Sequence, residues 1–521
     1  MSSWRGAWAL AGIVAGVAGL ATSYAVATAM TIREAPVVAV AEMVIRYTPG
    51  PVAERAISIL GHGDKPVLVA AILILLGAAF AFAGRLARRS WWLPAVVFGV
   101  LAAVGALAVA RQPGEAIGDF LPVAVGLVTW LVVLSLLTDP LRDAERKSPD
   151  GWVDDETGSA DDWSATSRRG FLLRAGIGVA VAVAVAGSGR LIGRGRRRVE
   201  ETRRLLRLSG VSEPTIPRNV RIGLKGISPW QTPNDDFYLI HTAIVVPTIE
   251  PRDWQIRIHG MVDREIVLTY DELLERRRTE AWITLNCVSN EVGGDLIGNA
   301  WWSGVRLAEL LTEAGASSEA DAVLQTSEDG WTCGTPLSAL RDGRGAMLAV
   351  AMNGMPLPID HGFPVRTIVP GLYGFVSACK WVVDLEVTRF DQIEAYWTEK
   401  GWAEEAPVKL ASRIDVPQSG DDVTAGDVRV GGVAWAQHIG IQGVEVALDG
   451  GAWQAAEIAG APTDDTWVQW AATVAVEEGD HQVRVRATDK NGDVQTGVEQ
   501  DVLPDGATGW HTVEFNAESA S

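Results

Sequence analysis

The first 190 residues alternate long apolar stretches with short charged segments. Four of the stretches run for about 17 to 24 residues with almost no charged side chains, and a helix of that length can cross a bilayer. They occupy residues 7–30, 66–83, 91–110 and 120–137. Residues 33–65 mix polar and apolar positions, which is typical of an interfacial helix or a loop. The pattern predicts a region of four transmembrane helices over residues 1–140.

Basic residues follow the second and the fourth apolar stretch. They are Arg85, Arg88 and Arg89 in one loop, and Arg142, Arg146 and Lys147 in the other. Because loops rich in Lys and Arg stay in the cytoplasm, both loops are expected there, and the parity of the crossings places the N-terminus there too. Residues 141–166, which are acidic and contain Gly and Ser, are expected to form a cytoplasmic linker.

A pair of arginines follows this linker. Residues 167–190 begin with Ser-Arg-Arg-Gly-Phe and continue as a weakly hydrophobic run, which resembles a twin-arginine export signal. The alternative is an ordinary fifth transmembrane helix with Arg168 and Arg169 as anchors. Either one places the C-terminal half outside the cytoplasm. Residues 190–207 contain eight arginines, however, and the positive-inside rule would keep these in the cytoplasm, so cytoplasmic retention stays open.

Short strands and helices alternate after residue 254. Strand patterns occupy residues 254–259, 265–268 and 281–285, and helical patterns occupy residues 269–278 and 306–314. Thr269 is the expected N-cap of the first helix. These patterns predict a mixed α/β domain over residues 233–405, after a basic linker over residues 191–232.

Only strand patterns remain after about residue 411. They occupy residues 428–435, 443–448, 467–476 and 481–488, separated by turns rich in Gly, Asp and Asn. Regular short strands of this kind predict a β-sandwich of roughly 100 residues, placed at residues 406–521. The expected fold class is therefore multidomain, with a transmembrane α-helical region, a mixed α/β domain and a C-terminal all-β sandwich.

Charge divides the chain of 521 residues in two. Residues 1–210 carry 23 basic and 17 acidic residues, a net charge of +6, whereas residues 211–521 carry 22 and 47, a net charge of −25. The acidic half is a poor binder of nucleic acid, because neutralising phosphates requires Lys and Arg on one face. No glycine motif of a dinucleotide or nucleoside triphosphate site occurs. Three cysteines exclude the disulfide framework of small secreted proteins.

One cysteine lies where a strand opens into a glycine-rich loop. Cys287 follows a strand pattern and precedes Gly293 and Gly294. This position presents a thiol at a strand edge, and thiolates favour soft transition metals. The alternative is a small core hydrophobe, which is the usual role of an isolated cysteine beside apolar residues. Cys333 and Cys379 lack such a loop and are expected in the core.

Ordered motifs connect this loop to a known family. They are Phe237-Tyr238 with His241-Thr242, the Cys287 loop with Gly304-Val305, and the run from His361-Gly362 through Arg366 to Gly374. Together they resemble the molybdopterin domain of the sulfite oxidase family. Motifs at residues 412–415, 432–435, 443–446 and 486–489 resemble that family's immunoglobulin-like dimerisation domain. The resemblance covers about residues 233–495, roughly half of the chain.

The resemblance implies a molybdenum–molybdopterin cofactor and a two-electron oxygen-atom transfer on a small-molecule substrate. It gives Cys287 the position of the thiolate that binds the metal, and hence the catalytic role. The cofactor-binding positions that it implies are Phe237, Tyr238, His241, Thr242, Cys287, Thr326, Ser327, His361, Arg366, Gly374, Ser377 and Lys380. It also implies a homodimer formed through the sandwich.

The anionic phosphate of a pterin requires donors in this acidic half of the chain. Arg366 and Lys380 carry charges that suit it, and a structural salt bridge is their alternative role. The same phosphate is expected to accept hydrogen bonds from His361, Ser377 and the amides near Gly374.

The chain departs from the family pattern on the substrate side. Leu239 and Ile240 precede His241 where sulfite oxidases place an Arg, and Trp402 stands where they place a Tyr. Losing two donors for a small oxyanion argues against sulfite as the substrate. No haem-binding CxxCH motif occurs, so electrons are expected to leave through a redox protein or the quinone pool.

Two other functions remain open. A reductase of S-oxides, N-oxides or oxidised Met residues would use the same centre in the reverse direction. A non-catalytic surface binding module could reuse the sandwich and the anchor, but it would have no use for Cys287, Arg366 and Lys380 together. The leading expectation is a multi-pass protein of the cell membrane with its catalytic domain on the extracytoplasmic side.

Overall fold

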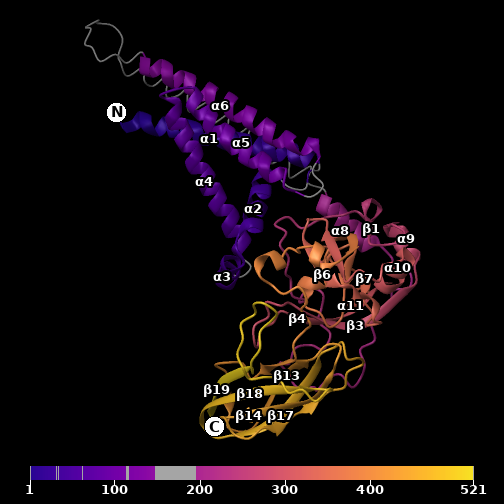
Figure 1. Cartoon of the computed structure of the whole chain (residues 1–521). Coiled ribbons are helices and arrows are strands. Elements are labelled where there is room, and N and C mark those ends of the chain that lie inside the picture. Colours follow the sequence, from indigo (N-terminus) through magenta and orange to yellow (C-terminus); the bar gives the residue numbers. More distant parts are fainter. Residues whose placement is uncertain are drawn as a thin grey trace. The chain divides into compact units, whose positions relative to one another are not determined.

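The computed structural model describes residues 2–30, 32, 35–60, 63–112, 116–146 and 195–519. The chain forms two compact units (Figure 1). Unit 1 comprises Met1–Arg198 with the short segment Thr242–Val246, and unit 2 comprises Val199–His241 and Pro247–Ser521. Residues 167–190, where the twin-arginine signal or fifth helix is expected, lie outside the described residues.

Unit 1 is built of helices. The long ones are α1 (Ser2–Ala29), α4 (Asp64–Ala87), α5 (Trp92–Val109) and α6 (Leu121–Arg146), which follows a short 3-10 turn at Ile117–Phe120. In the described part of the chain, these four helical segments are long and apolar enough to cross a membrane, as the sequence predicts. The stretch expected to be an interfacial helix or a loop contains two shorter helices, α2 (Pro36–Tyr47) and α3 (Gly50–Leu60).

Glycines bring α1 into close contact with α4 and α6. A Cβ added to Gly84 of α4 would overlap the carbonyl oxygen of Trp8 in α1. Trp130 of α6 packs against Gly19 and donates from Nε1 to the carbonyl oxygen of Gly16, 3.0 Å away. Small residues at such contacts let helix backbones approach closely, which favours helix association in a membrane.

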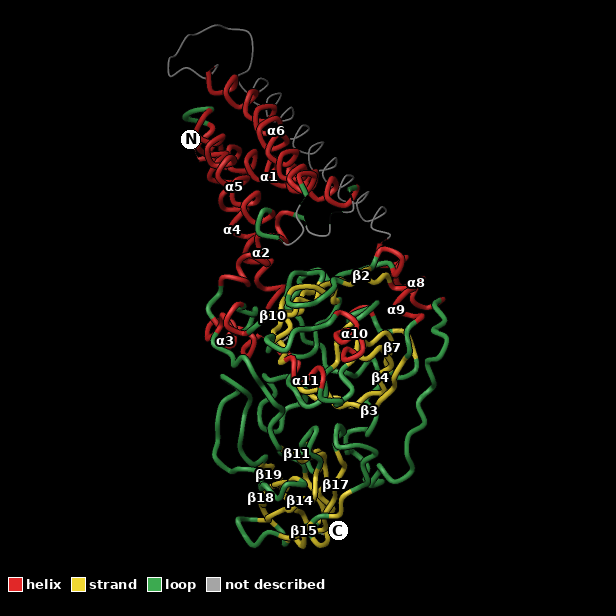
Figure 2. Tube along the Cα trace, turned by 45° about the vertical axis from the view of Figure 1, so that its right-hand side comes forward, coloured by secondary structure: helices red, strands yellow, loops and turns green. Residues whose placement is uncertain are grey.

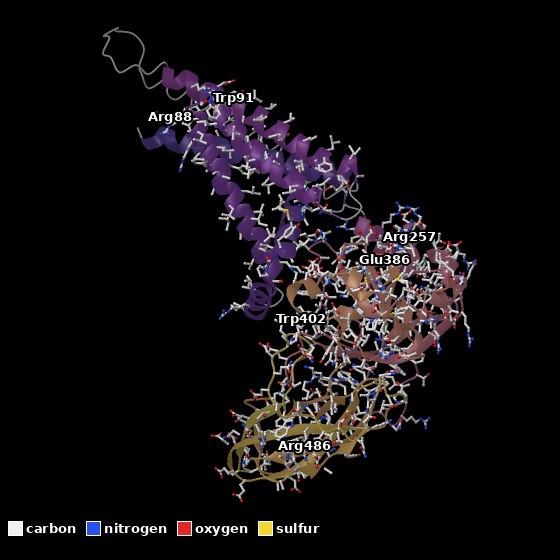
Figure 3. The ribbon with its side chains drawn as sticks, in the orientation of Figure 1. Arg88, Trp91, Arg257, Glu386, Trp402 and Arg486 are labelled. Carbon is white, nitrogen blue, oxygen red and sulfur yellow. The ribbon has the colours of Figure 1, made fainter. Side chains whose placement is uncertain are left out.

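The two loops predicted to face the cytoplasm lie at one end of unit 1. Arg88 and Trp91 mark the turn between α4 and α5 there (Figure 3). Arg142, near the end of α6, donates from Nη2 to the carbonyl oxygen of Ala87 over 3.0 Å. Because Trp8 contacts the same end of α4, the N-terminal part of α1 shares this end with both basic loops.

Two sheets form the α/β part of unit 2. The first has the strand order β2 (Ile266–Thr269), β1 (Gln255–Gly260), β10 (Val382–Thr388), β5 (Ala322–Ser327) and β6 (Thr332–Pro336). The second has the order β3 (Arg278–Asn286), β4 (Ile297–Arg306), β7 (Met347–Met352) and β8 (Met355–Pro356), and β9 (Arg366–Ile368) pairs with β7. Only β1 and β10 pair in parallel among these strands. This confirms a mixed α/β fold and not a doubly wound one.

Short helices complete this part. They are α8 (Gly195–Leu205), α9 (Tyr270–Glu275), α10 (Leu307–Ala314) and α11 (Leu337–Arg341), with 3-10 turns at Pro251–Asp253, Ile359–His361, Gly374–Val376, Phe390–Gln392 and Thr398–Lys400. Thr269 caps α9 as predicted, since its Oγ1 accepts from the amide of Glu272, whose carboxylate accepts from the amide of Thr269 at 2.8 Å. The helix ends before the predicted residue 278, because Arg276 is extended and β3 follows.

The C-terminal part of unit 2 is a sandwich of two sheets (Figure 2). One sheet has the order β11 (Ala411–Val416), β13 (Gly426–Trp435), β17 (Val468–Val476) and β16 (Glu457–Ile458). The other has the order β12 (Asp422–Thr424), β19 (Thr512–Glu518), β18 (Gly479–Asp489), β14 (Ile441–Leu448) and β15 (Gln454–Ala455). Inward-facing valines, with Trp470 and Phe515, form the core between the sheets. The four predicted strands correspond to β13, β14, β17 and β18.

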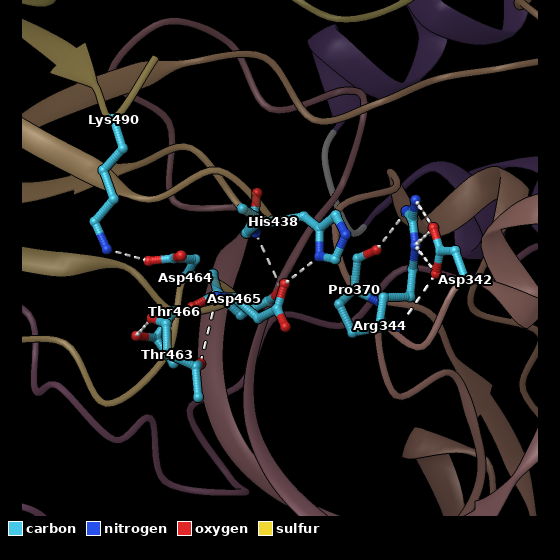
Figure 4. Close-up of polar contacts among 11 residues, drawn as sticks. Asp342, Arg344, Pro370, His438, Thr463, Asp464, Asp465, Thr466 and Lys490 are labelled. Atoms are coloured by element: carbon cyan, nitrogen blue, oxygen red, sulfur yellow. Dashed lines mark hydrogen bonds and ion pairs between the residues drawn. The ribbon is translucent and has the colours of Figure 1, made fainter. Parts of the chain in front are cut away.

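Figure 4 shows polar contacts on the two sides of the boundary between the sandwich and the α/β part. On the α/β side, Arg344 donates from Nη1 to the carbonyl oxygen of Pro370 over 3.0 Å. On the sandwich side, Nδ1 of His438 lies 3.3 Å from Oδ1 of Asp465, whose carbonyl oxygen accepts from the amide of Thr284 at 2.9 Å. Thr284 belongs to β3, so the sandwich supports the strand that leads into the glycine-rich loop.

The close contact of α1 with α4 predicts different effects for two glycines of one helix. Gly84→Leu should lower the thermal midpoint of the detergent-solubilised protein, because the added side chain overlaps α1 and overpacking costs about 1–3 kcal/mol. Gly77→Leu on the same helix is the matched control, since nothing lies within 4 Å of a Cβ at Gly77. Equal midpoints for the two variants, measured by scanning calorimetry, would contradict the packing.

Candidate functional site

The loop after β3 holds Cys287 in a closed turn. The amide of Cys287 donates to the carbonyl oxygen of Leu296 over 2.9 Å, which closes the loop at its base. Within the loop, the amide of Asn290 donates to the carbonyl oxygen of Cys287 (3.2 Å), and Oδ1 of Asn290 accepts from the amide of Leu296 (2.9 Å). Cys287 is half-buried, whereas Cys333 and Cys379 are fully buried, which agrees with their expected place in the core.

Gly374 and Tyr238 lie beside this loop. A Cβ on Gly374 would be 3.6 Å from the carbonyl oxygen of Asn286 and 3.8 Å from Oη of Tyr238. Burial raises the pKa of the Tyr238 phenol, and the nearby Cys287 raises that pKa further. Burial also raises the pKa of Tyr373 to about 12. Both phenols therefore remain protonated at neutral pH and stay hydrogen-bond donors next to the thiol.

Arg366 is a buried cation at the start of β9. Its side chain is 4% exposed, and it donates to the carbonyl oxygens of His361 (3.2 Å) and Ala378 (3.5 Å). Nε has no hydrogen-bond partner, and no carboxylate among the described residues forms an ion pair with this guanidinium. Burial lowers the pKa of Arg366 to about 10, so it stays charged at neutral pH. The structural salt bridge considered as its alternative role is thus absent among those residues.

His361 offers an acceptor beside this donor. Its Nε2 donates to the carbonyl oxygen of Asn234 at 3.2 Å, and Nδ1 has no partner among the described residues. Burial, helped by the charges of Lys380 and Arg366, lowers the pKa of His361 to about 3, so the ring is neutral and Nδ1 carries a lone pair. The neutral ring suits a ligand that donates to Nδ1, which differs from the donor role expected for His361.

Several other predicted residues gather around Trp381. Lys380 donates from Nζ to the carbonyl oxygen of Asp360 at 3.0 Å and lies 5.7 Å from the Trp381 ring centroid. The ring of His241 meets the Trp381 ring edge-on at 5.7 Å between centroids. Ser327 pairs with Val382 across β5 and β10, so the end of β5, which also carries the predicted Thr326, lies next to Trp381.

Three predicted residues are engaged elsewhere. Phe237 is buried and stacks on Tyr238, so its ring supports that residue from within the core. The hydroxyl of Ser377 donates to the carbonyl oxygens of Leu372 and Tyr373 inside its own turn. Thr242 belongs to the segment grouped with unit 1. The cofactor contacts expected of these residues stay predictions.

A buried network that the sequence did not reveal fixes the loop after Gly374. Gln325 donates from Nε2 to Oγ1 of Thr335 (2.6 Å), which donates to the carbonyl oxygen of Val376 (2.5 Å). Oγ1 of Thr367 donates to Oε1 of Gln325 (2.6 Å) and accepts from the amide of Cys379 (2.8 Å). These contacts join β5, β6 and β9, and no local pattern signals them. Trp302 was also missed, although its ring lies 5.3 Å from the Arg366 guanidinium and its Trp-Trp motif was visible.

Apolar residues occupy the positions where the sequence lacks oxyanion donors. Trp402 is 4% exposed and packs against Phe375, with 5.5 Å between ring centroids (Figure 3). Phe375 follows Gly374, which places this aromatic pair near the Cys287 loop. Leu239 and Ile240 are 37% and 42% exposed. The described residues contain no group of three His, Cys, Asp or Glu placed to hold a metal ion.

Comparisons with known proteins agree on one type of domain. The model of the oxidoreductase molybdopterin binding domain matches residues 243–397. Sulfite oxidase of Gallus gallus is 30% identical over 317 residues, which cover 51% of this chain and 68% of that protein. The uncharacterized oxidoreductase YuiH of Bacillus subtilis is 31% identical over 176 residues, 34% of this chain and 85% of that protein.

Longer relatives are matched over part of their length. The chain spans 57% of the mitochondrial sulfite oxidases of Macaca fascicularis and Mus musculus, at 30% and 29% identity over 313 residues, 51% of this chain. Among solved structures, the sulfane dehydrogenase SoxCD from Paracoccus pantotrophus is 25% identical, with a TM-score of 0.49, and the match covers 57% of this chain and 85% of that one.

The buried His361 predicts a specific acid sensitivity of the cofactor-free protein. Its folded-state pKa lies below the ordinary value of 6.5, so the unfolded chain binds the proton first and stability is lost as the pH falls. The free energy of unfolding should drop by about 1 kcal/mol between pH 6.5 and 5.5 on this account alone.

Chemical denaturation at several pH values checks this, and His361→Gln should remove that part of the loss. His481→Gln is the control, because a hydrogen bond to Asp449 raises the pKa of His481. The contribution of His481 to the free energy of unfolding therefore changes with pH in the opposite direction. The same pH dependence in wild type and in His361→Gln would refute the assignment.

Proposed function

Because the chain belongs to the sulfite oxidase family of molybdopterin-dependent oxidoreductases, we propose that it performs two-electron oxygen-atom transfer on a small substrate, with Cys287 as the protein ligand of molybdenum. The family implies the molybdenum–molybdopterin cofactor itself. The substrate, the role of each residue and the place of the reaction in the cell are parts of the proposal.

One observation carries the proposal most directly. Arg366 is a buried charge with an unused donor at Nε, and His361 beside it has an unused acceptor at Nδ1. A buried polar group without a partner costs roughly 1–3 kcal/mol, and a buried charge costs more. Both costs disappear if a ligand with donor and acceptor groups occupies this place. An anionic pterin cofactor has this chemistry, so the residues present fit the group.

The other proposed contacts follow from the same geometry. Arg366 and Lys380 would hold the anionic end of the cofactor, with the amides near Gly374, while His361 would accept a hydrogen bond from the pterin. Tyr238, His241, Thr326 and Ser327 lie around these groups and would complete the cradle. Phe237, Thr242 and Ser377 would act at its margins, through packing or through backbone atoms.

The cofactor, when bound, supplies a metal that exchanges two electrons and an oxygen atom with a substrate. The chain supplies the surroundings. Backbone hydrogen bonds hold Cys287 within its closed loop. Tyr238 keeps its proton and so stays a hydrogen-bond donor at Oη. Phe375, which follows Gly374, packs with the buried Trp402, and this aromatic pair would limit the access of water to the site.

The apolar residues on the substrate side favour an uncharged substrate. Leu239, Ile240 and Trp402 supply no cationic donor for an oxyanion such as sulfite. The same observation favours the second candidate, a reductase of S-oxides, N-oxides or oxidised Met residues. In dye-linked assays run in both directions, an uncharged S-oxide or sulfide should turn over faster than sulfite. Faster turnover of sulfite would exclude this substrate class.

The location is proposed from the helical unit and the signal-like segment. The proposed domains are four transmembrane helices (1–140), a linker (141–166), the signal or fifth helix (167–190), a basic linker (191–232), the molybdopterin domain (233–405) and the sandwich (406–521). The shared end of the two basic loops supports a cytoplasmic N-terminus. Within the basic linker, residues Gly195–Leu205 form the helix α8.

A reporter fused after Arg207 tests the topology. Alkaline phosphatase, which folds actively only outside the cytoplasm, should be active in this fusion, and replacing both Arg168 and Arg169 with Lys should abolish its activity. Phosphatase activity that survives the double replacement would favour an ordinary fifth helix. An inactive fusion to the unaltered sequence would place the catalytic domain in the cytoplasm.

Partners beyond the substrate follow from the family resemblance alone. A redox protein or the quinone pool would exchange electrons with the reduced or oxidised centre. The sandwich would form the interface of a homodimer.

The metal-binding role of Cys287 gives the test of the proposed function. Purified full-length protein should contain molybdenum and pterin, and Cys287→Ser should lower turnover at least about 100-fold. Metal and pterin analysis beside a dye-linked assay measures both. Cys333→Ala is the control, since Cys333 is fully buried in the core and should leave the metal content unchanged. Wild-type protein without molybdenum, from a host that makes the cofactor, would overturn the proposal.

A further inference from the structure

A buried ion pair in the sandwich lies behind the Cys287 loop. Arg413 and Asp415 both belong to β11, whose pairing with β13 shifts register at Asp415. Nε of Arg413 lies 2.7 Å from Oδ1 of Asp415, and the two side chains are only 9% and 8% exposed. Burying two charges costs desolvation energy that their attraction roughly repays, so stability alone does not explain the pair.

The remaining atoms of the pair bind two other segments. Nη1 of Arg413 donates to the carbonyl oxygen of Gly294 over 2.6 Å, and Nη2 donates to the hydroxyl of Ser228 over 2.8 Å. Oδ2 of Asp415 accepts from the amide of Ser228, also at 2.8 Å. Every nitrogen of the guanidinium thus has one acceptor, and Gly294 belongs to the loop that Cys287 begins. Charge-assisted hydrogen bonds of this kind are about twice as strong as neutral ones.

A second sandwich residue contacts the neighbouring glycine. Nδ1 of His511 accepts from the amide of Ile414 in β11 at 3.0 Å, which fixes the imidazole. A Cβ on Gly293 would overlap this ring, and Gly293 has φ +82, a left-handed conformation that side chains rarely adopt. Both glycines of the loop therefore pack on residues of the sandwich.

Hydrogen bonds within the Cys287 loop stabilise it only in part. Its base is closed by the Cys287–Leu296 hydrogen bond, and the amide of Gly294 donates to the carbonyl oxygen of Glu291 at 2.9 Å. These bonds fix the conformation of the loop itself. The orientation of the loop relative to the rest of the domain depends on contacts with other segments. Arg413 supplies a charge-assisted contact of that kind on the glycine side.

We propose that Arg413 and Asp415 are positioning residues for the Cys287 thiol. By binding Gly294 to β11, they hold the far side of the loop, and the loop in turn holds the sulfur. The sandwich then contributes directly to the metal site, beyond any part in association. The inference rests on the proposed function only in that Cys287 is the metal ligand.

Thiol reactivity of the cofactor-free full-length protein tests the positioning. Arg413→Met keeps the length of the side chain and removes its donors, and it should raise the alkylation rate of Cys287 by iodoacetamide about tenfold, because the loop opens more often. Peptide mass spectrometry measures each cysteine separately. Cys333 and Cys379, which are fully buried, should stay unreacted and so report that the fold is intact.

Arg486→Met is the matched control. Arg486 also forms an ion pair within the sandwich, 2.8 Å from Glu445, but it makes no contact with the loop (Figure 3). In Arg486→Met, the alkylation rate of Cys287 should stay within about twofold of the wild-type rate. An unchanged rate in Arg413→Met, or an equal rise in both variants, would overturn the proposal. If all three cysteines react in Arg413→Met, that variant is replaced by Asp415→Asn. An unchanged alkylation rate of Cys287 in Asp415→Asn would also overturn the proposal.

The loaded protein separates this inference from the proposed function. The EPR spectrum of the bound molybdenum should change in Arg413→Met and stay unchanged in Arg486→Met. If Cys287→Ser leaves that spectrum unaltered, the proposed metal ligand is wrong, whatever the alkylation rates show. If Cys287→Ser alters the spectrum and Arg413→Met alters neither the spectrum nor the alkylation rate, only the positioning role fails.

Discussion

The buried charge of Arg366 is the constraint on which the account of the site depends. Burial lowers its pKa to about 10, yet the guanidinium remains protonated at neutral pH, and no carboxylate among the described residues balances it. Two carbonyl oxygens and the Trp302 ring offset part of the cost. The donor left at Nε and the acceptor left at Nδ1 of His361 have no partner among the described residues, and a ligand could satisfy both. These unpaired buried groups therefore destabilise the cofactor-free fold locally, and cofactor binding would remove this destabilisation.

Long-range contacts bring this pair and the thiol into one part of the fold, where the Tyr238 phenol interacts with both Arg366 and Cys287. Arg366 begins β9, Cys287 follows β3, and Gly374 begins a turn whose backbone is held by the network of Gln325 and Thr335. The Cys287 loop is far in the chain from the run that carries Arg366 and Gly374, and buried hydrogen bonds hold that run. The sandwich adds the contact of Arg413 with Gly294. A site built from loop residues can be rigid when the elements behind those loops are packed in this way.

Local patterns predicted a large part of the fold. Alternation predicted four of the nine sandwich strands among the described residues, the N-cap of α9 followed from Thr269, and uninterrupted apolar runs predicted the long helices of unit 1. The strand-to-loop position of Cys287 left a core role open, and only the family resemblance gave it the position of the metal ligand. The partners of the site residues were beyond reach, because the contact of His361 with Asn234 and the internal bonding of Ser377 depend on tertiary packing. The neutral state of His361 follows from burial, which no local pattern reports.

The number of sulfur ligands on molybdenum tests the central claim most directly. X-ray absorption at the molybdenum edge of the loaded full-length protein counts these ligands. The account predicts three sulfurs, two from the pterin and one from Cys287, and the loss of one in Cys287→Ser. Two sulfurs in the wild-type protein, or three in the variant, would contradict the assignment of Cys287 as the metal ligand.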